Sequence, residues 1–388
     1  MPASSSRPGQ HSIDQLLQRR FRANPGYELL PREVCSVADS IPLQNLYEPL
    51  YGYLRPSASN LPWRQISPDT ALLFLSLQRE SIVPEYFCSL LGRHAERFLF
   101  RLVLDGVLEV EHSGQFIAGR AAKEFFLGDQ AHAPCGRIAE LSIEALKYAE
   151  ALGDLTVQEL TRRIYDYGRR PLSAYHNSTF DNPGTDFFGN LLNTVGSVLS
   201  AYWIRSSTAD PGWIMWRPIR IPGEIEDICY KLYVSPGLSD VAVALRVSAN
   251  ILGQSPGVRG LKVGRGLAGL SRADKIVAYF SRLDDLQQAG LRIQSELEGC
   301  AVHGVPFTAE LSGDGLLSWG ADPPRTNTSQ RRSWRLWLAG KLAAHLAAGR
   351  RSHTSSPTWQ FVLDRIRLDG VNPDTWVPDT GLWTSLNP

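Results

Sequence analysis

The segment YKLYVSP, from Tyr230 to Pro236, alternates apolar side chains with polar ones. Successive side chains of a β-strand point to opposite faces of the sheet. The alternation therefore predicts a strand whose Leu232 faces a core while Lys231 and Tyr233 share the other face. A cation and a phenol presented side by side indicate a functional site on that face.

A second basic segment follows at Gly260 to Arg265, where Lys262 lies between two apolar neighbours. Arginine binds phosphate through a planar fork of donors and lysine binds it as a point charge, so several such side chains would hold a phosphomonoester dianion. For any one of them, a solvated surface charge is the alternative, and it stays open. The candidate phosphate-binding residues are Arg265, Arg272, Lys275 and Arg335.

The run from Cys300 to Thr308 places His303 beside a glycine and three residues before a proline. Site residues often lie on irregular segments of this kind. The alternative is a core histidine whose nitrogens are satisfied by backbone groups. Both interpretations of His303 stay open from the sequence.

Overall composition predicts a soluble protein of more than one domain. The chain has 388 residues, of which 43% are hydrophobic, and its 40 basic and 39 acidic residues nearly cancel. Near-neutral charge argues against binding to nucleic acid or to an anionic membrane. Five scattered cysteines without a C-x-x-C pair argue against a disulfide framework and a zinc site. With no long apolar stretch, we expect a cytoplasmic protein.

The pattern of helices and strands predicts an α+β fold. Two helices near residues 72–77 and 94–104 precede a hairpin at 107–117, an order that resembles a winged helix. Thr156 is the expected N-cap of a later helix, and a mixed or antiparallel sheet is expected in the C-terminal half. The predicted domains are a loosely structured lead-in (1–65), a winged-helix-like peptide- or partner-binding domain (66–170), an α+β catalytic domain (171–350) and a C-terminal surface extension (351–388).

Several long motifs in the second half resemble the HopA-type effector family. This family includes type III effectors of plant pathogens and proteins of bacterial clusters that make thioamitides and class V lanthipeptides. The motifs are YKLYVSP at Tyr230–Pro236, LKVGR at Leu261–Arg265, RADKIVAYF at Arg272–Phe280, AVHGVPFTAEL at Ala301–Leu311 and GLLSWGADPP at Gly315–Pro324.

The resemblance implies a phosphoserine or phosphothreonine lyase without a metal or other cofactor. A cognate Ser/Thr peptide kinase, similar to aminoglycoside phosphotransferases, would phosphorylate a precursor peptide made of leader and core. The lyase would then eliminate the phosphate and leave dehydroalanine or dehydrobutyrine. The kinase would be the protein partner, in a stable or transient complex.

A more distant similarity, to phosphothreonine lyases of the OspF/SpvC type, implies roles for individual residues. These enzymes carry a K-x-H strand and, some 30 residues later, a base lysine before a valine; Lys231 and Lys262 match the two lysines. Tyr233 replaces the histidine, so either Tyr233 or His303 would be the general acid. Lys231 would neutralise the phosphate or polarise the peptide carbonyl.

Other classes of function compete with the lyase. One is a non-catalytic scaffold or activator of the kinase, which the replacement of histidine by Tyr233 keeps open. Another is a type III effector that acts on host proteins. A DNA-binding regulator is the third, and the near-neutral charge speaks against it.

Overall fold

The structure is a computed structural model, and it confirms an α+β protein. It describes residues 17–31, 51–57, 61, 63–92, 95–122, 132–153, 155–171, 187–207, 210–220, 229–323, 333–350 and 357–379. Every strand pair in these stretches is antiparallel. No helix in them is both long enough and apolar enough to cross a membrane.

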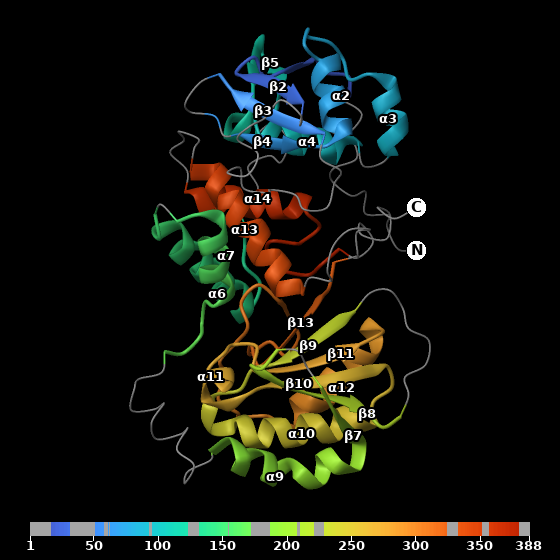
Figure 1. Cartoon of the computed structure of the whole chain (residues 1–388), viewed down its shortest axis with the longest axis vertical. Helices are drawn as coiled ribbons and strands as arrows, with labels where there is room; N and C mark the ends of the chain where they lie inside the picture. Colours follow the sequence, from blue (N-terminus) through green and yellow to red (C-terminus); the bar gives the residue numbers. More distant parts are fainter. Residues whose placement is uncertain are drawn as a thin grey trace, which may run out of the picture. The chain divides into compact units, whose positions relative to one another are not determined.

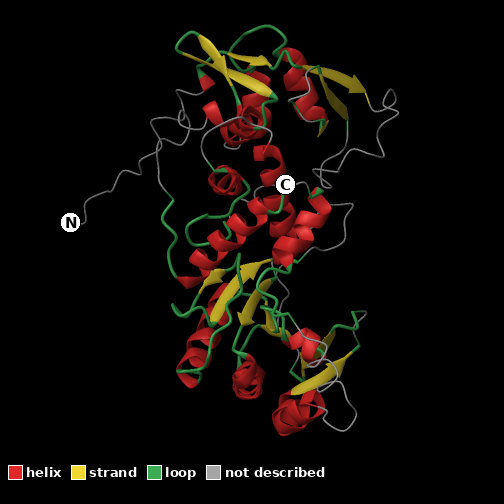
Figure 2. Cartoon of the chain, turned by 90° about the vertical axis from the view of Figure 1, so that its left-hand side faces the viewer, coloured by secondary structure: helices red, strands yellow, loops and turns green. Residues whose placement is uncertain are grey.

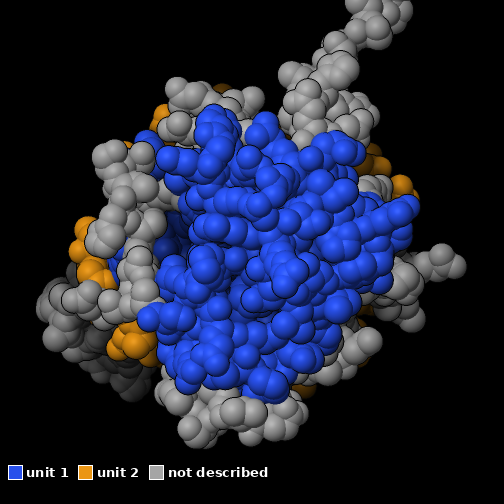
Figure 3. Space-filling view, turned by 90° about the horizontal axis from the view of Figure 1, so that it is seen from above, with its two compact units in different colours: residues 1–132, 326–329, 344–369 blue, residues 133–325, 330–343, 370–388 orange. Residues whose placement is uncertain are grey.

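The chain divides into two compact units, which Figure 3 colours separately. Unit 1 comprises residues 1–132, 326–329 and 344–369, and unit 2 comprises the remainder. The division differs from the predicted domains in two places. Residues 133–170, which were predicted to belong to the winged-helix-like domain, belong to unit 2. Residues 344–369, which were predicted to lie at the end of the catalytic domain and in the C-terminal extension, belong to unit 1.

Unit 1 contains two three-stranded sheets, ordered β1-β5-β6 and β2-β3-β4. The predicted hairpin is present, with Val110 of β5 opposite Ile117 of β6. Helices α2 and α4 match the two helices expected before it, α3 lies between them, and the winged-helix assignment itself stays a prediction. The described elements are β1 (Phe21–Ala23), β2 (Tyr27–Pro31), β3 (Gly52–Pro56), β4 (Arg64–Ile66), α2 (Pro68–Ser76), α3 (Glu85–Leu91), α4 (Ala95–Leu104), β5 (Leu108–His112), β6 (Gln115–Ile117) and α14 (Thr358–Leu368).

Part of the predicted lead-in belongs to the core of unit 1. Phe21 of β1 and Leu54 of β3 are fully buried, in one hydrophobic cluster with Leu99 and Val110. Burial of such side chains stabilises the unit by about 1.5–3 kcal/mol each. These strands are three to five residues long, too short for a periodic pattern to reveal them.

Helix α14, which lies within the predicted surface extension, is part of unit 1. Its Phe361 packs against Phe100 and Leu104 of α4. Its Arg365 pairs with Asp105, which also lies 3.3 Å from the guanidinium of Arg64. Burial alone would raise the pKa of Asp105, but the two guanidiniums outweigh it and hold that pKa below its usual range.

Unit 2 is built on a seven-stranded antiparallel sheet with the order β12-β13-β9-β11-β10-β8-β7 (Figure 1). Its described elements are α6 (Arg137–Ala151), α7 (Val157–Tyr165), α9 (Phe187–Tyr202), β7 (Trp203–Ser206), β8 (Trp213–Pro218), β9 (Tyr230–Val234), α10 (Val241–Gln254), β10 (Val258–Gly264), α11 (Gly266–Leu270), β11 (Ile276–Phe280), α12 (Leu283–Glu296), β12 (Ala309–Glu310), β13 (Leu317–Ala321) and the first turns of α13 (Trp334–Arg350).

The two faces of this sheet have different roles. Helices α10 and α12 pack on the face that carries Leu232 and Leu261 (Figures 1 and 2). The opposite face carries Lys231, Tyr233 and Lys262, and it approaches the end of α7 and the start of α13 through the contacts described below. We call this the site face.

Helix α6 is fastened to the segment before β13, so residues 133–170 belong to unit 2. The backbone N–H of Phe307 donates to Ser142 Oγ at 2.7 Å, and the backbone N–H of Ile138 donates to Glu310 Oε2 at 3.2 Å. Thr156 is the N-cap of α7, as expected, and forms a capping box with Glu159.

Candidate active site

The side chains of the site face form two rows across neighbouring strands. In antiparallel pairs, residues directly opposite one another lie on the same face. The first row is Ser318, Tyr233, Val277, Lys262 and Met215. The second row is Gly320, Lys231, Tyr279 and Gly260. The rows bring together the two lysines and Tyr233, which the sequence separates.

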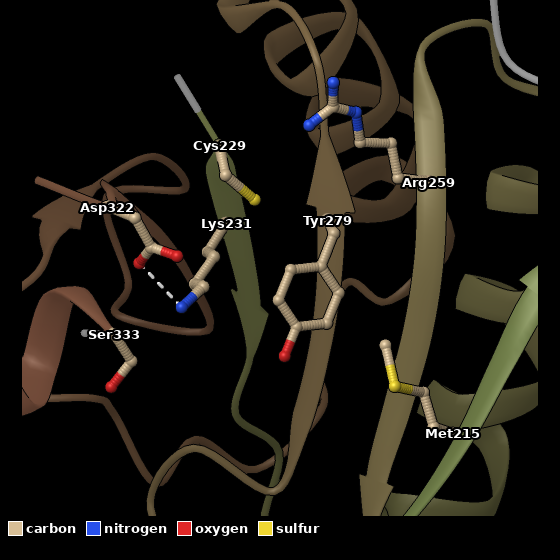
Figure 4. Close-up of a pocket in the computed structure, with 7 residues that line it drawn as sticks. All are labelled: Met215, Cys229, Lys231, Arg259, Tyr279, Asp322 and Ser333. Carbon is tan, nitrogen blue, oxygen red and sulfur yellow. Dashed lines mark ion pairs between the residues drawn. The ribbon is translucent and has the colours of Figure 1, made fainter. Parts of the chain in front are cut away.

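Lys231 is a buried ammonium held by a carboxylate. It is 5% exposed, and its Nζ lies 2.6 Å from Asp322 Oδ1, just beyond β13 (Figure 4). The same carboxylate oxygen accepts a hydrogen bond from the backbone N–H of Trp334, at 2.8 Å. The start of α13 and the strand β9 are thereby tied to one side chain.

Asp274 joins two arginines from different parts of the chain. Its carboxylate lies 2.9 Å from Arg272 Nε and 2.9 Å from Arg335 Nη1 of α13. Arg272 also donates to the hydroxyl of Tyr165 at 2.9 Å, and Arg335 donates to the backbone carbonyl of Tyr165 at 2.8 Å. Burial alone would raise the pKa of Asp274, but the two guanidiniums hold it well below its usual range.

Lys262 has a depressed pKa and stays partly accessible to solvent. Burial lowers the pKa of Lys262 to about 8, and the charges of Lys231 and Arg272 add to that effect while Asp274 opposes it. Its Nζ lies 3.9 Å from the centre of the Trp213 ring. A measurable fraction of this lysine is therefore a neutral amine near neutral pH.

Tyr233 and Tyr279 keep their phenolic protons. Burial is the main cause that raises the pKa of each well above its ordinary value, and the negative charge of Asp322 adds to it. Tyr233 is 2% exposed. Both phenols can therefore donate a hydrogen bond on the site face at any physiological pH.

Lys275, which is fully buried, and His303, which is partly buried, form a separate pair. Lys275 Nζ lies 2.9 Å from the carbonyl oxygen of Pro236 and 2.8 Å from His303 Nδ1, while His303 Nε2 contacts the carbonyl oxygen of Gly168. Because a carbonyl only accepts, Nε2 carries the proton and Nδ1 accepts from the lysine. Both imidazole nitrogens are thus engaged within the protein.

The electrostatics of this pair follow from its burial. Burial lowers the pKa of Lys275 to about 7, with a contribution from Arg170. Burial and the neighbouring Lys275 lower the pKa of His303 to about 4. Through the two rows and the ion pairs of Asp274 and Asp322, the structure brings together Lys231, Tyr233, Lys262, Arg272 and Arg335. Lys275 and His303 lie outside this cluster, and Arg265 is exposed. Lys262 and Tyr233, like Lys275 and His303, line neither of the two pockets described below.

A cavity of about 350 Å³ opens beside the Lys231–Asp322 ion pair (Figure 4). A volume of this size lies at the lower end of the range for ligand sites. The lining residues are Met215, Cys229, Lys231, Arg259, Tyr279, Asp322 and Ser333. A second pocket, with a volume of about 10 Å³, lies between Arg272, Arg335, Tyr165 and Asp274, and is large enough only for a water molecule.

Arg259 reaches the cavity because β10 is irregular. The register between β10 and β11 shifts between Val258 and Gly260, so Arg259 is the extra residue of a β-bulge. Bulges redirect side chains and are frequent beside active sites. Arg259 Nε also donates to Ser281 Oγ at 2.8 Å.

Sequence reasoning missed Arg259, Trp213 and the two organising carboxylates, Asp274 and Asp322. Both aspartates lie inside motifs that the sequence analysis quoted, RADK and WGADPP. The available signal was the position of each carboxylate: Asp274 lies between Arg272 and Lys275 in the sequence, and Asp322 follows Trp319. Their pairing depends on strand register, which the motifs do not contain.

The charges of the cluster favour an anionic ligand. Lys231, Arg272 and Arg335 oppose Asp274 and Asp322, which leaves one net positive charge when Lys262 is neutral and two when it is protonated. Within the described stretches, no three His, Cys, Asp or Glu residues lie close enough to hold a metal ion.

The sequence matches no protein-family model and no curated protein. Among solved structures, the fold is similar to an effector protein from Pseudomonas syringae pv. tomato strain DC3000, with 14% identity, a TM-score of 0.41, and coverage of 62% of this chain and 96% of that one. An effector from Pseudomonas syringae pv. syringae strain 61 has the same identity and coverage at a TM-score of 0.39. The type III effector and phosphothreonine lyase OspF from Shigella flexneri is similar at 11% identity and a TM-score of 0.28, over 40% of this chain and 97% of that one.

Proposed function

We propose that this protein is a phosphoserine or phosphothreonine lyase that acts on a phosphorylated peptide. The single observation that carries the proposal is Lys262, a partly accessible lysine whose pKa is lowered to about 8 on a sheet face with net positive charge. β-Elimination needs a neutral base for the α-proton and positive charge for the departing phosphate, and this site supplies both.

In the proposed reaction, Lys262 is the general base. Its neutral Nζ takes the proton from the α-carbon of the phosphorylated residue. The electron pair of that C–H bond forms the Cα–Cβ double bond, while the Cβ–O bond breaks and its electrons leave on the phosphate oxygen. Proximity of the base to the α-carbon replaces an otherwise slow encounter with solvent base.

Tyr233 is the proposed proton donor to the leaving phosphate. It lies next to Val277 in the first row, with Lys262 on the far side of Val277, and its raised pKa keeps it protonated. Lys262 then returns its proton to solvent or to the tyrosinate, so that the enzyme is regenerated. His303 is set aside for this role, since both of its nitrogens are engaged with Lys275 and Gly168.

The phosphate is proposed to bind at the end of the cavity beside Lys231. The cavity offers room there, whereas the pocket between Arg272 and Arg335 is too small for a phosphate. Arg259 lies on the wall of the same cavity. Arg272 and Arg335 act through the electrostatic potential of the cluster while they bind Asp274.

The biological setting is a further proposal, supported by the motif resemblance. The substrate would be a ribosomal precursor peptide of the thioamitide or lanthipeptide type, phosphorylated in the cytoplasm by a partner kinase. Dehydroalanine or dehydrobutyrine would be the product.

Incubation of the protein alone with a phosphoserine or phosphothreonine peptide tests the proposal. Mass spectrometry should show loss of phosphoric acid, because elimination removes the side-chain oxygen together with the phosphate. Lys262→Met should slow the loss by about 10²- to 10⁴-fold, as expected for removal of a general base. A mass decrease equal to HPO3, which leaves an intact serine or threonine in the peptide, would indicate a phosphatase instead. Binding without release of phosphate, with the kinase also present, would favour the scaffold.

A further inference from the structure

The indole of Trp213 faces two cations of the site. Lys262 Nζ lies 3.9 Å from its ring centre, and the Arg272 guanidinium carbon lies 4.8 Å from a Trp213 ring centre. Trp213 is the first residue of β8 and is opposite Gly264 on β10. Because the ring is 8% exposed, the interaction with Lys262 is largely shielded from water.

A cation over an aromatic face is stabilised by the ring quadrupole, whereas a neutral amine gains little. The ring therefore favours the protonated form of Lys262. The size of such interactions corresponds to about 0.4–1.5 pKa units, the larger value applying where the cation is desolvated. This effect opposes burial and the neighbouring positive charges.

We propose that the face of Trp213 is the resting position of the Lys262 ammonium, and that Trp213 is a positioning residue that couples deprotonation of Lys262 to its release toward substrate. Once Lys262 loses its proton, the ring no longer retains it. The neutral amine is then free to turn toward the cavity and the α-carbon. The catalytic meaning of this inference rests on the proposed lyase function, while the effect of Trp213 on the proton of Lys262 does not.

Other charged groups and a second aromatic ring also face Lys262, and the test must separate them from Trp213. They are Lys231 on β9, Tyr279 on β11, Arg272 and Asp274 before β11, and Asp322 after β13. None of them is altered when the charge distribution of the indole is changed at constant shape. Tryptophans fluorinated on the ring make that change, because fluorine withdraws charge from the ring face.

The experiment is a titration of Lys262 by NMR in the full-length protein without substrate. Lysine is labelled at Cε and Nζ, and the signal is assigned by its loss in Lys262→Met. With singly and then doubly fluorinated tryptophan, the pKa of Lys262 should fall in steps, by a total of about 0.4–1.5 units. An unchanged or raised pKa would overturn the proposal.

Point variants provide a second, independent measurement. Trp213→Phe replaces the indole by a ring that attracts a cation less strongly, so it should lower the pKa of Lys262. The shift should be smaller than the roughly 0.4–1.5 units expected when the whole attraction is lost. Trp216→Phe is the matched control, because Trp216 is a buried tryptophan of the same strand whose partner, Leu261, faces away from Lys262. It should leave the titration unchanged. Equal pKa shifts in both variants would mean that general repacking, and not the Trp213 face, is the cause.

Measurement of lyase activity distinguishes failure of the proposed role of Trp213 from failure of the proposed lyase function. If the pKa shifts but no phosphopeptide reacts, the resting position stands and the proposed function fails. If elimination occurs and the pKa of Lys262 does not move with fluorination, the function stands and the role of Trp213 is wrong. If both hold, the acidic limb of the pH–rate profile should shift by the same amount as the titration.

Discussion

At the scale of single residues, the site depends on a lysine whose charge is opposed by its surroundings. A lysine side chain in water has a pKa of about 10.4 and is protonated at neutral pH. For Lys262, burial and two neighbouring cations lower that pKa to about 8. Lys231 and Arg272 can act on it because Asp322 and Asp274 hold them in place as cations.

The pH dependence of the reaction follows from Lys262. Only its neutral form accepts the α-proton, so kcat/KM should rise about tenfold per pH unit below pH 8 and level off above it. Tyr233 stays protonated across this range because its pKa is raised. The measurement is phosphate release from a phosphopeptide between pH 6 and pH 9.5. A flat profile between pH 6 and 8 would exclude Lys262 as the base.

Asp274 should contribute strongly to stability, because it is 4% exposed and binds two guanidiniums. Asp274→Asn leaves these guanidiniums without a counter-charge and should reduce the free energy of unfolding by about 3–5 kcal/mol. Urea unfolding followed by tryptophan fluorescence measures this. The control Asp284→Asn, at an exposed pair, should change it by less than about 1 kcal/mol.

The lowered pKa of Asp274 determines how the free energy of unfolding changes as the pH falls. Its folded-state pKa is lowered, so its contribution is fully present above the unfolded pKa of ~3.9 and is lost as the pH falls below that value. Wild type should therefore lose more stability than Asp274→Asn between pH 5 and pH 3. Parallel acid curves for the two proteins would contradict the assigned ion pairs.

At the scale of elements, strand β9 was predictable, but the pairing that determines which strands flank it, and in which register, was not. Alternation in Tyr230–Val234 requires only the local geometry of a strand, and the structure has that strand. The rows that join Lys231, Tyr233 and Lys262 depend on the register of three strands. Register is set by pairing between distant segments and, for Arg259, by a bulge, so no local pattern contains it.

Lys275 and His303 show the same limit. Their segments suggested a site, but the fold uses them to join the end of β9, the loop at 303 and the end of α7 through Pro236 and Gly168. The alternative left open for His303 is a core histidine satisfied by backbone groups; in the structure Nε2 contacts a backbone carbonyl, whereas Nδ1 is hydrogen-bonded to the side chain of Lys275. A basic residue in a conspicuous motif can therefore serve assembly of the site rather than chemistry.

This role of Lys275 predicts an alkaline stability slope. The pKa of Lys275 is lowered to about 7 in the folded protein, against ~10.4 in the unfolded chain. Between these values the unfolded chain binds more protons, so stability should rise with pH by up to about 1.4 kcal/mol per unit. Lys275→Met should remove this contribution, which urea unfolding at pH 7.5, 8.5 and 9.5 would measure. An unchanged slope would mean that Lys275 is protonated when folded.

At the scale of the whole molecule, the sequence predicted the α+β class but not the division of the chain. Unit 1 recruits α14 from the end of the chain, and unit 2 recruits α6 and α7 from before the predicted boundary. The turn-rich composition after residue 170 suggested a boundary because loops and linkers share that composition. Long-range contacts such as Ser142 with Phe307 decide the division, and composition does not report them.

The recruitment of α14 gives a prediction for unit 1. Arg365→Met removes one of the two guanidiniums that hold the buried Asp105, and should lower the stability of unit 1 by about 3–5 kcal/mol. The exposed pair of Arg55 and Glu28 in the same unit is the control, and Arg55→Met should cost less than about 1 kcal/mol. Hydrogen exchange of β5 amides reads out unit 1 alone. Equal effects of the two substitutions would mean that α14 does not depend on this ion pair.

The central claim, that Lys262 removes an α-proton and phosphate leaves by C–O cleavage, is tested most directly with a phosphopeptide deuterated at the α-carbon of the phosphorylated residue. The account predicts a dehydroamino acid that a thiol can trap, formed more slowly from the deuterated peptide in wild type and lost in Lys262→Met. Serine or threonine as the product, at the same rate from both peptides, would contradict it.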